Sequence, residues 1–129
     1  MLNEEAEARN KYDLAERTAI FGENVIKFMK EIKETTITRP LISQLIRSAT
    51  SIGANYMEAD CAESRKDFVH KIGIARKESK ETAYWLRILA TTVPGHQGKC
   101  EQLSGEATEF TRIFSAIART GKLNLSKNI

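Results

Sequence analysis

Two stretches of this sequence decide its fold: QLIRSATSIGANYMEAD at residues 44–60 and SRKDFVHKIGIARKESKETAYWLRILA at residues 64–90. Apolar or small residues recur along them at alternating steps of 3 and 4, which places each series on one stripe of a helix. The first series is Ile42, Leu45, Ala49, Ile52 and Tyr56, and the second is Phe68, Ile72, Ala75, Ser79, Thr82, Leu86 and Leu89. The spacing predicts two amphipathic helices folded back on each other.

Local signals set the expected helix boundaries. Ser64 followed by Asp67 has the spacing of a capping box and predicts a helix start. The threonines before Pro40 predict the end of one helix, with Thr38 as the N-cap of the next. Gly121 is expected to end the last helix. The predicted helices span about residues 4–34, 39–60, 64–92 and 99–120, and a loose tail follows at 121–129.

The outer two segments repeat the same apolar spacing. The first carries Leu14, Thr18, Phe21, Val25, Phe28 and Ile32, and the last carries Leu103, Ala107, Phe110, Phe114 and Ile117. Gly53, inside the second helix, is expected to let a neighbouring helix approach closely. Four periodic segments with short connections predict an all-α fold in one domain of 129 residues, an antiparallel up-down-up-down four-helix bundle.

Composition and charge argue against several classes of protein. The net charge of +3 is mildly basic, well below that of a nucleic-acid-binding arm or a polybasic membrane anchor. No apolar run approaches the roughly 20 residues that span a bilayer, and the first ten residues are acidic and polar, unlike a signal peptide. We expect a cytoplasmic protein that does not bind membranes, with Cys61 and Cys100 as free thiols.

The sequence carries no pattern that predicts catalysis. A di-metal bundle site needs Glu-x-x-His pairs that project inward, and none occurs. His70 and His96 are expected on the surface, without a nucleophile placed beside them. There is no phosphate-binding loop and no dinucleotide fingerprint. We therefore expect no enzymatic activity, no cofactor and no metal ion.

A network of polar side chains is expected where the second and third helices face each other. Folding one helix back on the other pairs positions whose numbers add to roughly 125. This register puts Arg47 opposite Glu78, Gln44 opposite Glu81, and Glu58 near Lys66 or Lys71. Because Glu78 and Glu81 share a stripe with apolar residues, they are expected to be half-buried and to need partners. The network is interpreted as structural.

A basic stripe is expected on the outer face of the third helix. Steps of 4 and 3 from Lys66 give His70, Gly73, Lys77, Lys80, Tyr84 and Arg87, about 200° from the apolar seam. Residues 64–92 hold 7 basic and 3 acidic residues. Lysine and arginine bind phosphates and Tyr84 can stack on an unpaired base, so the stripe predicts weak, sequence-independent binding of RNA or DNA. The alternative is an ordinary solvated helix face.

The apolar face of the third helix is wider than the core of a single four-helix bundle requires. Ile74, Trp85 and Ile88 lie beside the seam of the third helix and widen its apolar face beyond about three positions in seven. Surplus apolar surface of this kind indicates a second buried interface. We expect these residues to contact other copies of the chain in a homo-oligomer. The alternative is that they cover the edges of a single bundle.

The central run resembles one known family. The matching residues are Gln44-Leu45, Arg47-Ser48-Ala49-Thr50-Ser51-Ile52-Gly53-Ala54-Asn55, Glu58, Lys66-Asp67-Phe68, Ile74-Ala75 and Glu81-Thr82. They are similar to the 23S rRNA intervening-sequence proteins, to which the accessory variability determinant of diversity-generating retroelements is related. The resemblance covers about residues 14–118. It implies a left-handed antiparallel bundle, ring-like homopentamers and no catalytic activity.

Three functions remain open at this point. The first is a non-enzymatic oligomeric scaffold, with bundles assembled in a ring. The second is a basic accessory protein that binds RNA or DNA through the outer face of the third helix. The third is a monomeric bundle that partners another helical protein.

Overall fold

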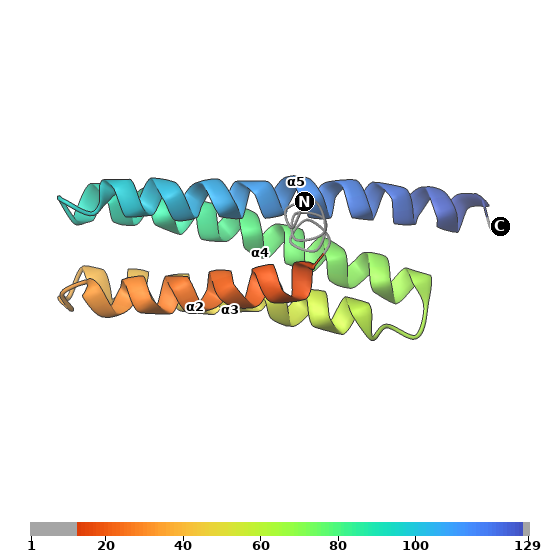
Figure 1. Cartoon of the computed structure of the whole chain (residues 1–129), viewed down its shortest axis with the longest axis horizontal. Coiled ribbons are helices and arrows are strands. Elements are labelled where there is room, and N and C mark those ends of the chain that lie inside the picture. Colours follow the sequence, from red (N-terminus) through yellow and green to blue (C-terminus); the bar gives the residue numbers. More distant parts are fainter. Residues whose placement is uncertain (1–12, 128–129) are drawn as a thin grey trace, which may run out of the picture.

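The computed structural model describes the backbone from Asp13 to Lys127 and the side chains from Asp13 to Lys122. Four helices follow one another along the chain: α2 (Leu14–Glu31), α3 (Thr38–Asp60), α4 (Arg65–Thr92) and α5 (Gln97–Lys127). Figure 1 shows them lying roughly along one axis, with α4 and α5 as one pair and α2 and α3 as the other. Each connection reverses the chain direction, which confirms the predicted antiparallel four-helix bundle.

The core consists of the predicted apolar seams. Its largest fully buried side chains are Phe21, Phe28, Phe110, Phe114, Leu45, Ile52, Ile72, Leu86 and Leu89. Phe21 of α2 meets Phe110 of α5 edge to face, with 5.5 Å between the ring centroids. Burying a side chain of this size contributes about 1.5–3 kcal/mol relative to leaving it exposed. This contact therefore joins the first described helix to the last.

The connection between α2 and α3 is capped differently from the prediction. The Thr35 hydroxyl accepts hydrogen bonds from the amides of Ile37, at 3.2 Å, and Thr38, at 3.0 Å. The Thr38 hydroxyl accepts from the Thr35 amide at 2.8 Å and donates to the Lys33 carbonyl at 2.7 Å. Thr35 therefore satisfies the first amides of α3, and Thr38 is the helix's first residue. These bonds also fix the turn, so α2 ends at Glu31 rather than near residue 34.

The small residues of α3 allow α2 to lie close to it. A Cβ atom at Gly53 would sit 3.0 Å from Thr18 Oγ1, so the close approach expected at Gly53 is confirmed. Thr18 is itself buried and donates its hydroxyl to the Leu14 carbonyl at 2.7 Å. A buried hydroxyl with a backbone partner avoids the penalty of an unsatisfied polar group. The start of the first helix expected near residue 4 lies outside the described residues.

The connection between α3 and α4 follows the sequence signals closely. α3 ends without a glycine, at Cys61 with an ordinary φ of −98°. The Ser64 hydroxyl accepts a hydrogen bond from the Asp67 amide at 3.0 Å, which is the predicted N-cap. α4 then runs for 28 residues. Within the described chain, only Gly95, in the connection from α4 to α5, has a positive φ, +92°.

The last helix is longer than the sequence predicted. α5 has 31 residues and continues through Gly121 to Lys127, so the expected end at residue 120 and the loose tail at 121–127 are wrong. Residues 128–129 lie outside the described chain. A Cβ at Gly121 would lie 2.6 Å from Val69 Cγ2. This glycine therefore lets α5 pass close to α4 and does not end the helix.

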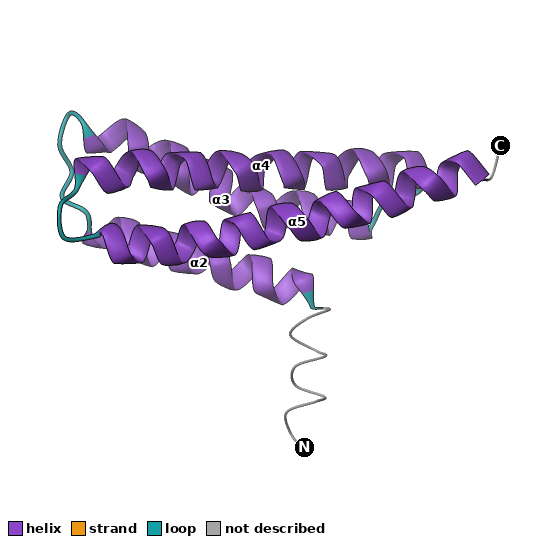
Figure 2. Ribbon diagram, turned by 90° about the horizontal axis from the view of Figure 1, so that it is seen from above, coloured by secondary structure: helices purple, strands orange, loops and turns teal. Residues whose placement is uncertain are grey.

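The bundle is unequal at its two ends. α2 has 18 residues and α5 has 31, which correspond to about 27 Å and 47 Å of helix. α2 and α5 meet over a short stretch only, whereas α4 and α5 touch along most of their length. In both views the end of α5 extends past the connection between α3 and α4 (Figures 1 and 2). The C-terminal half of α5 and the N-terminal half of α4 therefore form one surface.

Candidate functional site

The outer face of α4 carries the basic stripe predicted from the sequence. Its side chains are all exposed: Lys66, His70, Lys77, Lys80, Tyr84 and Arg87. They point outward because Ile72, Ala75 and Leu86 occupy the opposite, fully buried face. Tyr84 is 55% exposed, and its ring lies edge to face with that of Trp85, at 5.1 Å between centroids. An aromatic ring thus lies open among the cations of the stripe.

The positive charges of the stripe are not neutralised by any described carboxylate. The ion pairs among described side chains involve Arg17, Arg39, Arg47, Lys71 and Arg112, and none of the four lysines and arginines of the stripe. Exposed cations without carboxylate partners keep their full attraction for external anions. The stripe is therefore a surface on which a polyanion can replace water and counterions.

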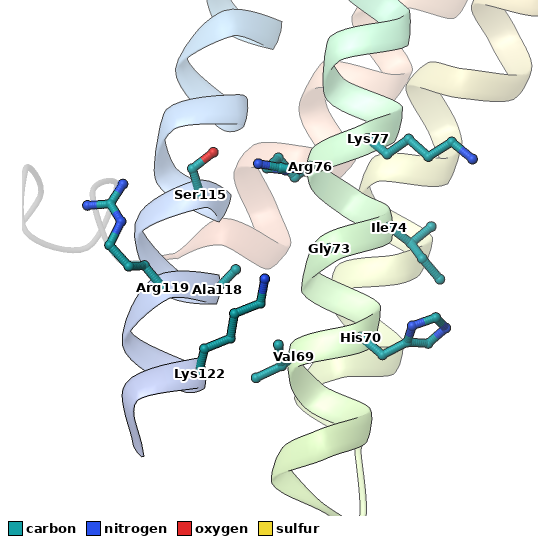
Figure 3. Close-up of a pocket in the computed structure, with 10 residues that line it drawn as sticks. All are labelled: Val69, His70, Gly73, Ile74, Arg76, Lys77, Ser115, Ala118, Arg119 and Lys122. Atoms are coloured by element: carbon teal, nitrogen blue, oxygen red, sulfur yellow. The ribbon is translucent and has the colours of Figure 1, made fainter. Parts of the chain in front are cut away.

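A groove between α4 and α5 adds to this surface. It has a volume of about 670 Å³, and no carboxylate lines it. Four of its lining residues are cationic: Arg76, Lys77, Arg119 and Lys122. Gly73 lies on the part of α4 that faces the viewer in Figure 3, with Lys77 on one side and Arg76 on the side nearer to α5. We call this feature the basic groove.

Three residues of the basic groove were not predicted from the sequence: Arg76, Arg119 and Lys122. The periodicity of a single helix does not relate Arg76 to Lys122, which are separated by 46 positions of sequence. Lys122 also lies beyond the predicted end of the last helix. One signal was available, because residues 110–122 contain three basic residues and no acidic one.

The polar network between α3 and α4 is centred on Arg47. Its guanidinium contacts Glu78 at 3.2 Å and Glu81 at 2.5 Å. Gln44, which the register placed opposite Glu81, instead accepts a hydrogen bond from Arg47 Nε at 3.2 Å. Trp85 donates its indole N–H to Glu81 at 3.2 Å. Arg47 therefore bridges two carboxylates of α4.

The electrostatic effect of this network follows from those contacts. The hydrogen bond from Arg47 holds the pKa of Glu81 below its ordinary value, although desolvation opposes that shift. The same bond raises the pKa of Arg47. Elsewhere between α3 and α4, Glu58 forms an ion pair with Lys71 at 3.3 Å. Lys71, and not Lys66, is therefore the partner of Glu58. These contacts join α3 to α4. No described carboxylate lines the basic groove.

The residues expected at an oligomer interface are half-buried. Trp85 packs against the core of the bundle, and Ile74 and Ile88 are partly exposed. Figure 3 shows Ile74 beside His70 and Lys77, on the side of α4 away from α5. The structure thus places two isoleucines with residual apolar surface along the edge of the basic stripe.

No three His, Cys, Asp or Glu side chains between residues 13 and 122 lie together as metal ligands. Cys61 is exposed and Cys100 is buried, where desolvation raises the pKa of its thiol. His96 packs its ring against Phe28, with 5.7 Å between centroids, and is partly buried. No helix of the described chain is apolar enough over a sufficient length to span a bilayer.

Comparison with known proteins shows a family and a solved structure to which this chain is similar. The chain matches the family described as 23S rRNA-intervening sequence protein over residues 7–116. It is similar to a protein of unknown function from the S23 ribosomal protein family of Bacteroides thetaiotaomicron, known from a crystal structure. The two are 34% identical over 81% of this chain and 94% of that one, with a TM-score of 0.73. No protein with a curated description matches the chain. Since the family match spans most of the sequence, the chain belongs to the 23S rRNA-intervening sequence protein family.

Proposed function

We propose that this protein is non-enzymatic and binds nucleic acid through the outer face of α4. The observation that carries the proposal is the exposed stripe whose four lysines and arginines have no carboxylate partner among the described residues. Binding of a polyanion releases the counterions held along its phosphates, and this release drives association. Flexible lysine and arginine side chains on a helix face contact phosphates without reading bases. The binding is therefore independent of sequence.

Tyr84 favours a single strand over a duplex. Its ring is exposed and lies one turn from both Lys80 and Arg87. A base stacks on an aromatic ring only when it is not already stacked in a helix, and each such contact contributes about 1–3 kcal/mol. Single-stranded RNA and DNA are the ligands with unpaired bases next to phosphates. We take single-stranded RNA as the probe.

The first prediction concerns reversal of the positive charges of the stripe. Anisotropy of a labelled single-stranded RNA measures the affinity at about 50 and 200 mM salt. With three or four phosphate contacts the parent's affinity is expected to fall about 20- to 50-fold across that range. Changing Lys77, Lys80 and Arg87 together to Glu is expected to abolish most of the binding at low salt.

A matched variant controls for net charge in this test. Lys27, Lys30 and Lys33 are exposed on or next to α2, and changing them together to Glu gives the same change in charge. This control is expected to lose much less affinity than the stripe variant. Equal loss in both, or no binding of RNA by the parent even at low salt, would exclude a nucleic-acid site on α4. Binding to anionic lipid vesicles without binding to RNA would also overturn the proposal.

A second candidate function is a homo-oligomeric scaffold. The observation that favours it is the residual exposure of Ile74 and Ile88 next to the half-buried Trp85 on α4. Apolar side chains at the edge of a bundle lose contact with water when a second copy covers them. The resemblance described above implies a ring of five copies. The two functions are compatible, because a ring would repeat the basic stripe around its axis.

A further inference from the structure

Gly73 leaves a gap in the row of side chains of the basic stripe, and we call this gap the low point. It lies one turn from His70 and one turn from Lys77 on α4, and it is the only residue of the stripe without a side chain. A Cβ atom built there would meet nothing within 4 Å. Packing therefore gives no reason for a glycine at this helical position, although glycine disfavours a helix by about 1 kcal/mol relative to alanine.

The basic groove opens at this low point. Figure 3 shows His70, Ile74 and Lys77 on one side of α4, and Arg76 on the side nearer to α5. Lys122 of α5 completes the groove on that side, whereas the side chain of Arg119 extends away from α4. Cations thus lie on both sides of Gly73, and the surface between them is not blocked by a side chain.

The groove suits a phosphate group. Arg76 carries a guanidinium group, which binds phosphate oxygens through paired hydrogen bonds, and Lys122 adds a compact charge. Neither Arg76 nor Lys122 has an ion-pair partner among the described residues. Ser115 donates its hydroxyl to the Thr111 carbonyl at 2.7 Å, so its proton is already engaged. The cations are therefore the groups that hold the anion.

We propose that a nucleic-acid strand crosses α4 at Gly73, with one backbone phosphate held in the groove by Arg76 and Lys122. This inference rests on the proposed function and adds the path of the strand. From the groove the strand passes over Gly73 onto the basic stripe, where Lys77 and Lys80 meet the following phosphates. A strand confined to the stripe would follow the axis of α4 and would not need the groove.

Filling the low point tests this path without changing any charge. Gly73→Leu places a side chain on the open surface, and leucine favours a helix more than glycine does, so folding is expected to be preserved. Single-stranded RNA at low salt is expected to bind this variant at least about tenfold more weakly, the effect of losing one charged hydrogen bond. Gly105→Leu is the matched control, because a Cβ at Gly105 of α5 also meets nothing within 4 Å and lies outside the groove.

A second experiment reverses the charges of the groove. Arg76→Glu with Lys122→Glu is compared with Lys30→Glu and Lys33→Glu on the α2 side. Each phosphate contact on a single strand contributes about 0.7 to the slope of log affinity against log salt. The groove variant is expected to lower that slope by about 0.7, and the control is expected to leave it unchanged. Thermal unfolding of all variants verifies that they are folded.

The outcomes separate this inference from the proposed function. RNA binding that is lost on reversal of Lys77, Lys80 and Arg87, but unaffected by either Gly73→Leu or the groove variant, would keep the function and overturn the path. No binding by the parent would overturn both. Weaker binding in both experiments, with both controls like the parent, supports the crossing at Gly73.

Discussion

Arg47 of α3 forms ion pairs with two carboxylates of α4, Glu78 and Glu81. It is 46% exposed, whereas its partner Glu78 is only 11% exposed. Glu78 is thus a nearly buried carboxylate whose charge is balanced from the surface. Removing the partner of a buried charge destabilises a protein more than removing an exposed pair, because the remaining charge stays away from water.

The substitution Arg47→Ala is therefore expected to lower the free energy of unfolding by about 1–2 kcal/mol, between the ranges for exposed and buried pairs. Urea denaturation measures it. Arg39→Ala is the control, because Arg39 and Glu34 are both 68% exposed and their pair contributes about 0–1 kcal/mol. Equal stability of the two variants would show that Glu78 does not need Arg47.

The contact of Arg47 with Glu81 gives this stability a pH dependence. Arg47 lowers the pKa of Glu81 in the folded protein below its ordinary value of 4.5. A depressed carboxyl pKa stabilises the fold above the unfolded-state value and loses that effect as the pH falls through the folded-state value. The difference between the parent and Arg47→Ala is accordingly expected to shrink below pH 4.5.

At the scale of the helix, Gly121 of α5 lies at a close contact with α4. Gly105 and Gly121 lie in the same helix, and a Cβ would meet nothing at Gly105 but would approach Val69 to 2.6 Å at Gly121. Val69 is β-branched and has little freedom to move aside. The same substitution is therefore expected to have different effects at the two positions.

Gly105→Ala is expected to stabilise the protein by up to about 1 kcal/mol through helix propensity. Gly121→Ala is expected to lose that gain to the contact with Val69. Combining Gly121→Ala with Val69→Ala is expected to restore the gain relative to Val69→Ala alone, which a double-mutant cycle measures. If Gly121→Ala stabilised as much as Gly105→Ala, the two helices would not be in close contact there.

These two glycines also show which features of the fold can and cannot be predicted from the sequence. The periodic apolar residues from Leu14 to Phe28 and the capping pair at Ser64 predicted helices correctly, because both signals are local. The role of Gly121 was predicted wrongly, because it depends on Val69 of another helix. The basic groove was missed for the same reason: Arg76 and Lys122 come together only when α4 and α5 pack.

At the scale of the whole molecule, the half-exposed apolar residues on α4 bear on whether copies of the chain form a homo-oligomer. A monomer would have the chain mass of 14.5 kDa. If copies pack through Ile74, Trp85 and Ile88, light scattering at micromolar concentration is expected to give a multiple of that mass, and five copies is the multiple that the resemblance implies. Ile74→Glu with Ile88→Glu is expected to lower the mass, since a charge buried at an interface is strongly unfavourable.

Two results would contradict this expectation. A parent protein with the mass of one chain would exclude a stable homo-oligomer under those conditions. An unchanged oligomer in the double variant would place the contact on another surface. Ile20, which is 44% exposed on α2, supplies the control: Ile20→Glu is expected to leave the mass unchanged.

Trp85 gives the molecule an intrinsic optical signal. It is the chain's single tryptophan, its indole is hydrogen-bonded to Glu81, and its ring touches that of Tyr84. Tryptophan emission therefore originates at one known place, between the Arg47 network and the outer face of α4. Its wavelength reports the hydration of the seam between α3 and α4, and its intensity reports quenching by a base stacked on Tyr84. Unlabelled protein can thus be followed by fluorescence both in unfolding and in titration with RNA.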